Sequence, residues 1–164
     1  MQQETLAVIL AEVSGTFTTT SAPVAATRLA AALVLGGVIG FEREIRDKPA
    51  GLRTNMLVSM AACLFILISQ QLASSGFAND NALRVDPLRL IEAVTAGVAF
   101  LAAGMIFRAD DKIHNATTGA SMWLAGAVGL ACGAGQIPLA AMATAIVLTV
   151  LMVLRWLEKW MGTH

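Results

Sequence analysis

The sequence predicts an all-α integral membrane protein, a bundle of five transmembrane helices with the N-terminus outside and the C-terminus in the cytoplasm. Three observations lead to this fold class. Hydrophobic residues make up 57% of the 164-residue chain and charged residues only 13%, against roughly 25% in an ordinary soluble domain. The apolar residues gather in segments long enough to cross a bilayer, which takes about 20 residues. The basic residues gather on one side of the resulting topology.

Five segments have the length and composition of a membrane span. They form one transmembrane domain, 23–160, preceded by an N-terminal segment, 1–22, whose apolar run suits a short helix lying at the interface. Pro23, Pro87 and Pro138 stand where spans begin, at positions whose missing N–H is not needed by the helix. The spans are expected at about 24–41, 54–72, 89–107, 117–133 and 138–157.

The orientation follows from the distribution of Lys and Arg, which accumulate in cytoplasmic loops. Eight basic residues lie on the side of the loop after the first span: Arg43, Arg46, Lys48, Arg53, Arg108, Lys112, Arg155 and Lys159. Three lie on the opposite side: Arg28, Arg84 and Arg89. The loop after the first span is therefore expected to face the cytoplasm.

Small residues at helical spacing indicate how the spans meet. They occur on the first, third and fourth spans: Gly36, Gly40, Gly97, Gly104, Ala125, Gly129 and Gly133. Apolar helices in lipid usually pack through such residues, because small side chains let two backbones approach. Contacts within one bundle and contacts between copies both fit this pattern, so a homo-oligomer stays open.

Seven of the twelve residues at 42–53 are charged, directly after the first span. Three pairs of opposite charge are four residues apart: Glu42 with Arg46, Arg43 with Asp47, and Glu44 with Lys48. A helix that continued to Pro49 would close all three as ion pairs. Carboxylates near a helix C-terminus favour a nearby cation. Because Mg²⁺ takes carboxylate oxygens and keeps several waters, Glu42, Glu44 and Asp47 are candidate Mg²⁺ ligands, with self-contained salt bridges as the equal alternative.

Three motifs occur in order along the chain. They are GGVIGFERE at 36–44 with KPAGLRT at 48–54, DPLR at 86–89 leading into GVAFLAAG at 97–104, and TTGASMW at 117–123. Together they resemble the signatures of the MgtC/SapB family of bacterial inner-membrane proteins, over about 28–157. Asn55 stands where members of this family commonly have histidine. Longer members also carry a soluble C-terminal domain, and the chain is expected to be a short form without it.

The resemblance implies a multi-pass protein of the bacterial inner (plasma) membrane, in a virulence-associated family. Its implied role is magnesium homeostasis, or adaptation to low magnesium, acid stress or life inside a host cell. We expect a non-enzymatic regulator that acts through the cytoplasmic charged loop, with Mg²⁺ as the one cofactor in view. The lipid bilayer and another inner-membrane protein are the expected partners. Residues expected to bind a partner or a cation are Glu42, Arg43, Glu44, Lys48, Gly51, Arg53, Asp86 and Arg89.

The alternative function is a small magnesium transporter or channel. It rests on Glu92, an ionisable residue one turn inside the third span, with Arg28 of the first span as a candidate partner. Intramembrane carboxylates are functional candidates by default. A purely structural pair between these two residues is the competing interpretation.

Two further classes receive less support. Eleven basic and eleven acidic residues give no net charge, which argues against nucleic acid as a partner. An enzyme is the weakest class, because no serine or cysteine nucleophile has a histidine partner at a readable spacing. His114 stands near Asp110 and Asp111, but a charged loop is more often simply solvated.

Overall fold

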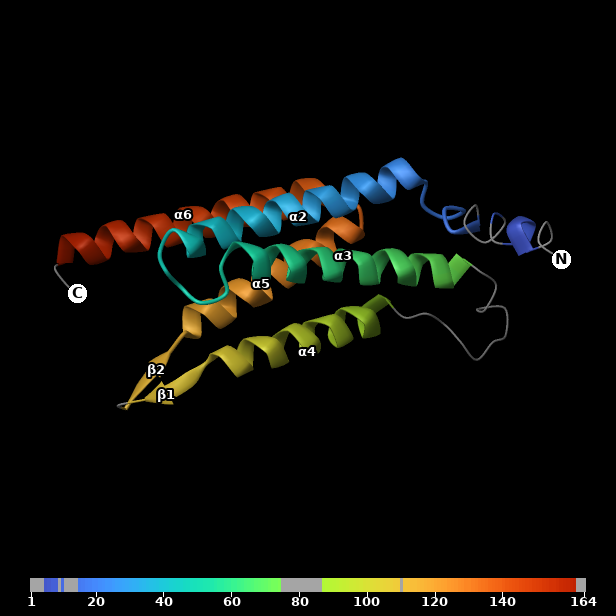
Figure 1. Cartoon of the computed structure of the whole chain (residues 1–164). Coiled ribbons are helices and arrows are strands. Elements are labelled where there is room, and N and C mark those ends of the chain that lie inside the picture. Colours follow the sequence, from blue (N-terminus) through green and yellow to red (C-terminus); the bar gives the residue numbers. More distant parts are fainter. Residues whose placement is uncertain (1–4, 9, 11–14, 75–86, 110, 162–164) are drawn as a thin grey trace.

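The computed structural model describes the chain at residues 5–8, 10, 15–74, 87–109 and 111–161. Its elements are α2 (Ala22–Glu44), α3 (Leu52–Ser74), α4 (Pro87–Met105), β1 (Phe107–Ala109), β2 (Lys112–His114), α5 (Ala116–Gly133) and α6 (Ile137–Met161). The helices lie alongside one another, and the two strands project from one end of the bundle (Figure 1). Of the N-terminal segment expected to lie at the interface, residues 5–8 are helical and much of the rest falls outside the described residues.

The predicted membrane class is confirmed. Four helices in the described part of the chain are long and apolar enough to cross a membrane: α2, α3, α4 and α6. The chain is therefore a multi-pass membrane protein. The remaining predicted span corresponds to α5, an 18-residue helix that does not belong to that apolar group.

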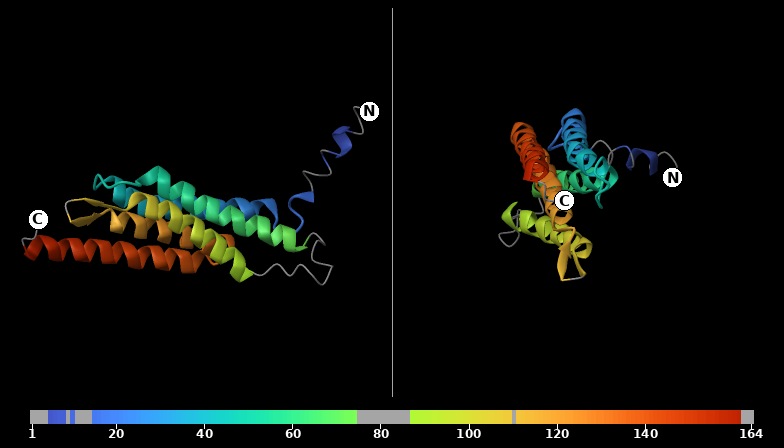
Figure 2. Two further views of the ribbon diagram at one scale, coloured as in Figure 1. Left: turned by 90° about the horizontal axis from the view of Figure 1, so that it is seen from below. Right: turned by 90° about the vertical axis from the view of Figure 1, so that its left-hand side faces the viewer.

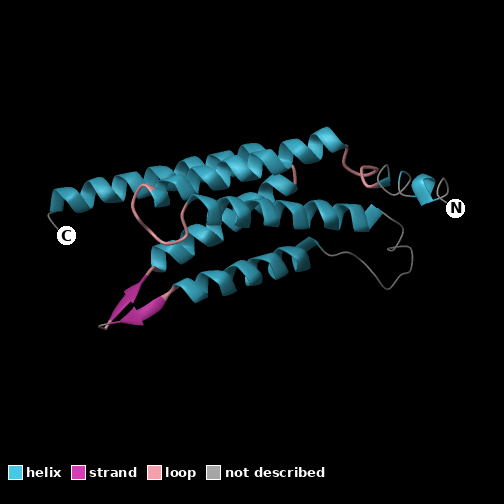
Figure 3. Ribbon diagram, viewed as in Figure 1, coloured by secondary structure: helices cyan, strands magenta, loops and turns pink. Residues whose placement is uncertain are grey.

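A β-hairpin stands where the sequence predicted the end of one span and a charged loop. Helix α4 ends at Met105, and β1 pairs antiparallel with β2 in the register Phe107 with His114 (Figure 3). The Nδ2 of Asn115 donates to the Met105 carbonyl at 3.2 Å, which joins the two ends of the hairpin. Strands of three residues are too short to show the alternation that identifies a strand in a sequence.

Helix α5 occupies the centre of the bundle. It contacts each of the other four helices, and the end-on view of Figure 2 shows it between α2 and α6 on one side and α4 on the other. Ten of its residues are buried, and most of them are glycine, alanine, serine or threonine. Small side chains at these positions let the neighbouring helices approach the α5 backbone closely.

Glycines bring α3 into direct contact with helices on two sides. A Cβ atom added to Gly36 of α2 would lie 2.6 Å from the Ser59 Cβ, and one added to Gly40 would lie 2.7 Å from the Leu52 Cα. On the other side of α3, a Cβ added to Gly129 of α5 would collide with the Ser59 carbonyl group. The small-residue contacts predicted for these two spans therefore lie within one chain.

The glycines of α4 behave differently. Gly97 and Gly104 have open space where a Cβ would stand, so they make no close contact with the described part of the chain. The packed side of α4 consists instead of Val94, Val98 and Ala102.

Arg28 joins three helices at the end of the bundle opposite the hairpin. Its Nη1 donates to the Gln70 side chain of α3 at 3.1 Å and to the Gly133 carbonyl of α5 at 2.9 Å. Gly133 is the last residue of α5, where the carbonyl groups lack partners in the helix and attract a cation. Glu92 is exposed on α4, and no ion pair joins it to Arg28 in the described part of the chain. The expected pairing of Arg28 with Glu92 is not formed.

We predict that Gly129→Ala lowers the stability of the purified protein. The added methyl group would meet the Ser59 backbone, which cannot move without displacing α3, and such overpacking costs about 1–3 kcal/mol. Gly97→Ala is the matched control and should leave the melting temperature in detergent unchanged or slightly higher. Equal melting temperatures for the two variants would contradict the close approach of α3 and α5.

We also predict that Arg28→Met destabilises the fold, because it leaves the Gly133 carbonyl and the Gln70 side chain without their donor. Hydrogen bonds to a charged group contribute about 1.5–3 kcal/mol, and methionine keeps most of the apolar stem. Glu92→Gln should leave the melting temperature unchanged. A similar fall in melting temperature for both variants would contradict this prediction and support a structural pair between Arg28 and Glu92.

Candidate functional site

The candidate site is the turn between α2 and α3. Helix α2 ends at Glu44, because the backbone N–H of Asp47 donates to the Glu44 carbonyl and that of Lys48 to the Arg43 carbonyl. Asp47 adopts a left-handed conformation with φ of 50°. These two bonds and that conformation form a Schellman motif, which terminates a helix. The expected continuation of the helix to Pro49 is wrong, and with it the predicted pairs Arg43–Asp47 and Glu44–Lys48.

Arg43 points into the bundle. Its side chain is only 3% exposed, and its Nη2 donates to the Thr118 hydroxyl at 2.7 Å and more weakly to the Thr117 hydroxyl at 3.5 Å. Both threonines lie in the first turn of α5. A guanidinium group carries five donors in a planar arrangement, so it can join helix ends that approach from different directions. Arg43 therefore connects the end of α2 to the beginning of α5.

Glu44 connects the turn to α3. Its Oε2 accepts the backbone N–H of Leu52 at 2.9 Å, at the positive N-terminal end of that helix. A Cβ atom at Gly51 would collide with this carboxylate, so the contact requires glycine at that position. The carboxylate that was unfavourable at the end of α2 is thus stabilised by the beginning of α3.

Asn55 holds the turn from inside the bundle. Its Nδ2 donates to the Ala50 carbonyl at 2.6 Å and the Gly51 carbonyl at 2.9 Å, and the residue is fully buried. Ala50 needs this support because it has a φ of 55° in the left-handed region. Sequence reasoning noted Asn55 only as a departure from the histidine of the family pattern. A polar residue one turn inside an apolar helix was the signal that could have identified it.

Glu42 forms the one predicted ion pair that is confirmed. Its Oε1 lies 2.5 Å from the Arg46 Nε, and the residue is 8% exposed. Neither carboxylate oxygen accepts a hydrogen bond, so the contact with Arg46 is electrostatic and not directional. Glu42 and Arg46 both line a groove between α2 and α6.

The three candidate Mg²⁺ ligands are not brought together. Glu42 lies in the groove beside α6, Glu44 contacts the N-terminus of α3, and Asp47 is exposed in the turn. Among the residues that the structure describes, no group of three or more His, Cys, Asp or Glu side chains could hold a metal ion. The turn is organised by bonds within the protein.

The remaining residues of the turn form an exposed surface. We call it the turn surface and define it as Ile45, Asp47, Lys48, Pro49 and Arg53. Ile45 is the largest apolar side chain in this set and is 64% exposed. A single exposed aliphatic residue is common on protein surfaces, so the exposed charges are the distinctive feature of this set.

The other candidate residues lie apart from the turn. Arg89 is exposed in the first turn of α4, whereas Asp86 and Asp110 fall outside the described residues. The ring of His114 stacks on Phe107 with 5.2 Å between centroids. Arg108 pairs with Asp111 at 2.8 Å. His114, Arg108 and Asp111 thus make their contacts within the hairpin.

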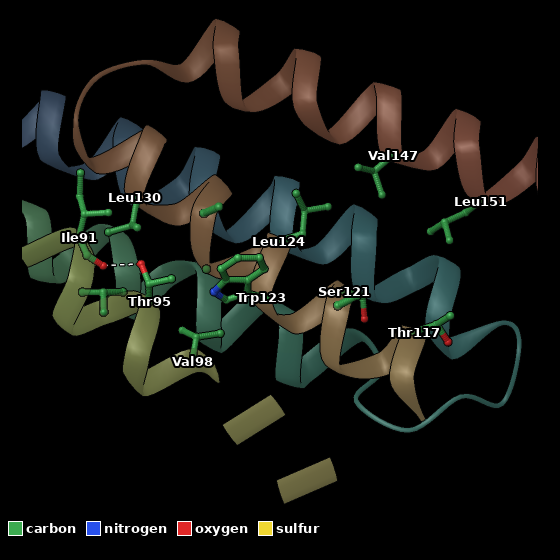
Figure 4. A pocket seen from close by; sticks show the side chains of 14 residues that line it. Ile91, Thr95, Val98, Thr117, Ser121, Trp123, Leu124, Leu130, Val147 and Leu151 are labelled. Atoms are coloured by element: carbon green, nitrogen blue, oxygen red, sulfur yellow. Dashed lines mark hydrogen bonds between the residues drawn. The ribbon is translucent and has the colours of Figure 1, made fainter. Parts of the chain in front are cut away.

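A second cavity, of about 520 Å³, lies between α4, α5 and α6. Its lining is uncharged and includes the Trp123 ring, and the one hydrogen bond drawn there joins the Thr95 hydroxyl to the Ile91 carbonyl of the same helix (Figure 4). This cavity offers apolar surface and no ionic group.

The sequence is similar to curated bacterial proteins over most of its length. It is 39% identical over 127 residues to Protein MgtC of Brucella abortus, which covers 77% of this chain and 50% of that protein. Protein MgtC of Salmonella typhimurium is 37% identical over 127 residues, 77% of this chain and 51% of that protein. Protein SapB of Bacillus subtilis is 39% identical over 109 residues, 66% of this chain and 47% of that protein.

The chain spans about half the length of these curated relatives. No solved structure matches it. A sequence model described as the MgtC family matches residues 29–160, which include α3, α4, α5 and nearly all of α2 and α6. The match therefore covers the turn, the glycine contacts and the hairpin, and the chain belongs to the MgtC family.

Proposed function

We propose that the chain is a non-enzymatic regulator in the bacterial inner membrane that serves magnesium homeostasis or adaptation to low magnesium or acid stress. The turn surface would contact another inner-membrane protein. The magnesium-related role rests on membership of the MgtC family. The assignment of the contact to the turn surface rests on the geometry of the turn.

The proposal rests on the observation that some polar residues of the turn are bonded within the bundle, whereas others are exposed. The side chains of Arg43, Glu44 and Asn55 form hydrogen bonds that hold the turn to α3 and α5. Lys48 and Arg53 are exposed. A rigid turn that presents exposed charges and an exposed Ile45 loses little conformational entropy when a partner covers it.

The proposed topology has five crossings with the turn in the cytoplasm. Helix α5 is about 27 Å long at 1.5 Å per residue, close to the thickness of the hydrocarbon core. It runs from the hairpin end of the bundle to the opposite end, and α6 returns beside α2 (Figure 1). The turn, the hairpin and the end of α6 then lie at one end, which is the end rich in Lys and Arg.

Transport of Mg²⁺ draws less support. Its sequence basis was Glu92 with Arg28, and Arg28 instead contacts Gln70 and Gly133. Glu92 is exposed on α4, away from the packed side that carries Val94 and Val98. A carboxylate that carries an ion across the membrane would face the interior of the bundle or a water-filled cavity.

We predict that reversing charges on the turn surface abolishes partner binding without unfolding the protein. The test is affinity capture of the full chain from its native membrane under magnesium limitation. Lys48→Glu with Arg53→Glu should lower recovery of a specific partner about tenfold or more, because like charges across an interface cost several kcal/mol. The melting temperature should stay close to that of the wild type, as for most surface substitutions.

The matched control is Arg108→Glu with Lys112→Glu, which makes the same change of charge on the hairpin at the same end of the bundle. It should leave partner recovery unchanged. Equal recovery by the turn double variant and the wild type would contradict the proposal, as would equal losses in both double variants.

We further predict that sealed vesicles containing the purified chain take up Mg²⁺ no faster than protein-free vesicles at any imposed gradient. A regulator that acts through a contact surface needs no ion path. Flux above the background that disappears in Glu92→Gln would instead establish the transport alternative.

A further inference from the structure

A groove of about 460 Å³ lies between α2 and α6 near the end of the bundle that carries the turn. Its walls are apolar and include Val38 and Phe41 of α2 and Met152 and Trp156 of α6. The two helices run in the same direction, so residues with higher numbers on both lie nearer the turn (Figure 1). The end of the groove farther from the turn is therefore apolar, and the charged residues lie at the end nearer the turn.

The charged end has an excess of positive charge. Arg46 and Arg155 line the groove together with Glu42, so two guanidinium groups face one carboxylate. The Glu42 charge is balanced by Arg46 at 2.5 Å. Arg155 pairs with none of the side chains that the structure describes. Among the described side chains, one arginine in the groove thus has no counter-charge.

Glu42 contributes charge to the groove and no open acceptor. Both of its carboxylate oxygens are buried, so a ligand in the groove does not reach them. The Glu42 charge instead holds Arg46 beside the groove. The groove therefore combines Arg155, which has no partner among the described side chains, with an apolar wall.

The charged end of the groove lies at the level along the helices where lipid headgroups are expected. Arg155 lies in the last turn of the apolar stretch Ile137–Leu157 of α6, and α2 ends at Glu44. Trp156 is 68% exposed at the same level, and tryptophan is enriched where a membrane protein meets the bilayer interface. The apolar part of the groove then faces the acyl chains of the same leaflet.

We propose that this groove is a binding site for an anionic phospholipid such as phosphatidylglycerol. The phosphate lies against Arg155 beside Arg46, and the acyl chains pack on Val38 and Met152. Arginine suits this role because its donors bind two phosphate oxygens at once. Basic pockets between membrane helices are recognised sites for anionic headgroups. The site shares Ile45 with the turn surface but none of its charged residues, and it does not depend on the regulatory role.

The experiment measures phospholipid binding to the purified full-length chain in detergent, by native mass spectrometry and by melting temperature. Phosphatidylglycerol should be retained and raise the melting temperature, whereas phosphatidylcholine with the same acyl chains should not. Arg155→Gln should bind phosphatidylglycerol about tenfold more weakly, the loss expected for one charge-assisted contact. Arg108→Gln, which removes an exposed arginine of the hairpin, should bind it as the wild type does.

A steric variant tests the apolar part of the groove. Met152 lines it and is 60% exposed, so Met152→Trp should fill the groove and abolish retention while leaving the lipid-free melting temperature unchanged. Met142→Trp is the matched control, because Met142 is 55% exposed on the same helix outside the groove.

Three results would overturn the proposal. They are equal retention of the two lipids, equal losses in Arg155→Gln and Arg108→Gln, and full retention in Met152→Trp. Stabilisation by inorganic phosphate alone, equal to that by phosphatidylglycerol, would also overturn it, because the site would then recognise a free anion.

Discussion

The fold depends on the close approach of α3 to α2 on one side and to α5 on the other, and Ser59 lies at both contacts. Its Cβ atom faces Gly36 and its carbonyl group faces Gly129. Lipid provides no hydrophobic force that drives apolar helices together, so their association relies on van der Waals contact between backbones that lie close. Glycine permits that distance. The contact also sets the spacing between the end of α2 and the beginning of α5, which brings Arg43 within reach of Thr118.

The charged turn is stable at the membrane boundary because its charges are divided between two environments. Arg43 is buried and bonded to threonine hydroxyls, and Glu44 accepts an N–H at the beginning of α3. Both contacts stabilise a charge with donors or acceptors that the neighbouring helices supply. Lys48 and Arg53 remain exposed. A turn built in this way keeps its shape while it presents charge to whatever lies outside the membrane.

The two sides of the bundle differ in how closely they are packed. Helices α2, α3 and α5 meet through glycines, whereas α4 and α6 border the cavities and the groove. Gly97 and Gly104 of α4 face open space, although they too lie on one side of their helix, two turns apart. A rigid centre with looser outer helices leaves room for lipid or a partner at the periphery. The groove beside Arg155 is the place where that periphery also carries charge.

The sequence by itself determined the membrane class, the positions of the helices within a few residues and the family motifs. Hydropathy and glycine spacing are local properties, so the linear pattern contains them. The tertiary structure decided which glycines make contacts, that Arg28 bonds to Gln70 and Gly133, and that the candidate Mg²⁺ ligands point to separate places. It also decided that α2 stops at Glu44, although the charge spacing favoured a longer helix. The first three outcomes depend on groups from helices distant in sequence, which a local pattern does not contain. The end of α2 is set by the backbone bonds of Asp47 and Lys48, and the contact of Glu44 with the N-terminus of α3 replaces the ion pair that the charge spacing suggested.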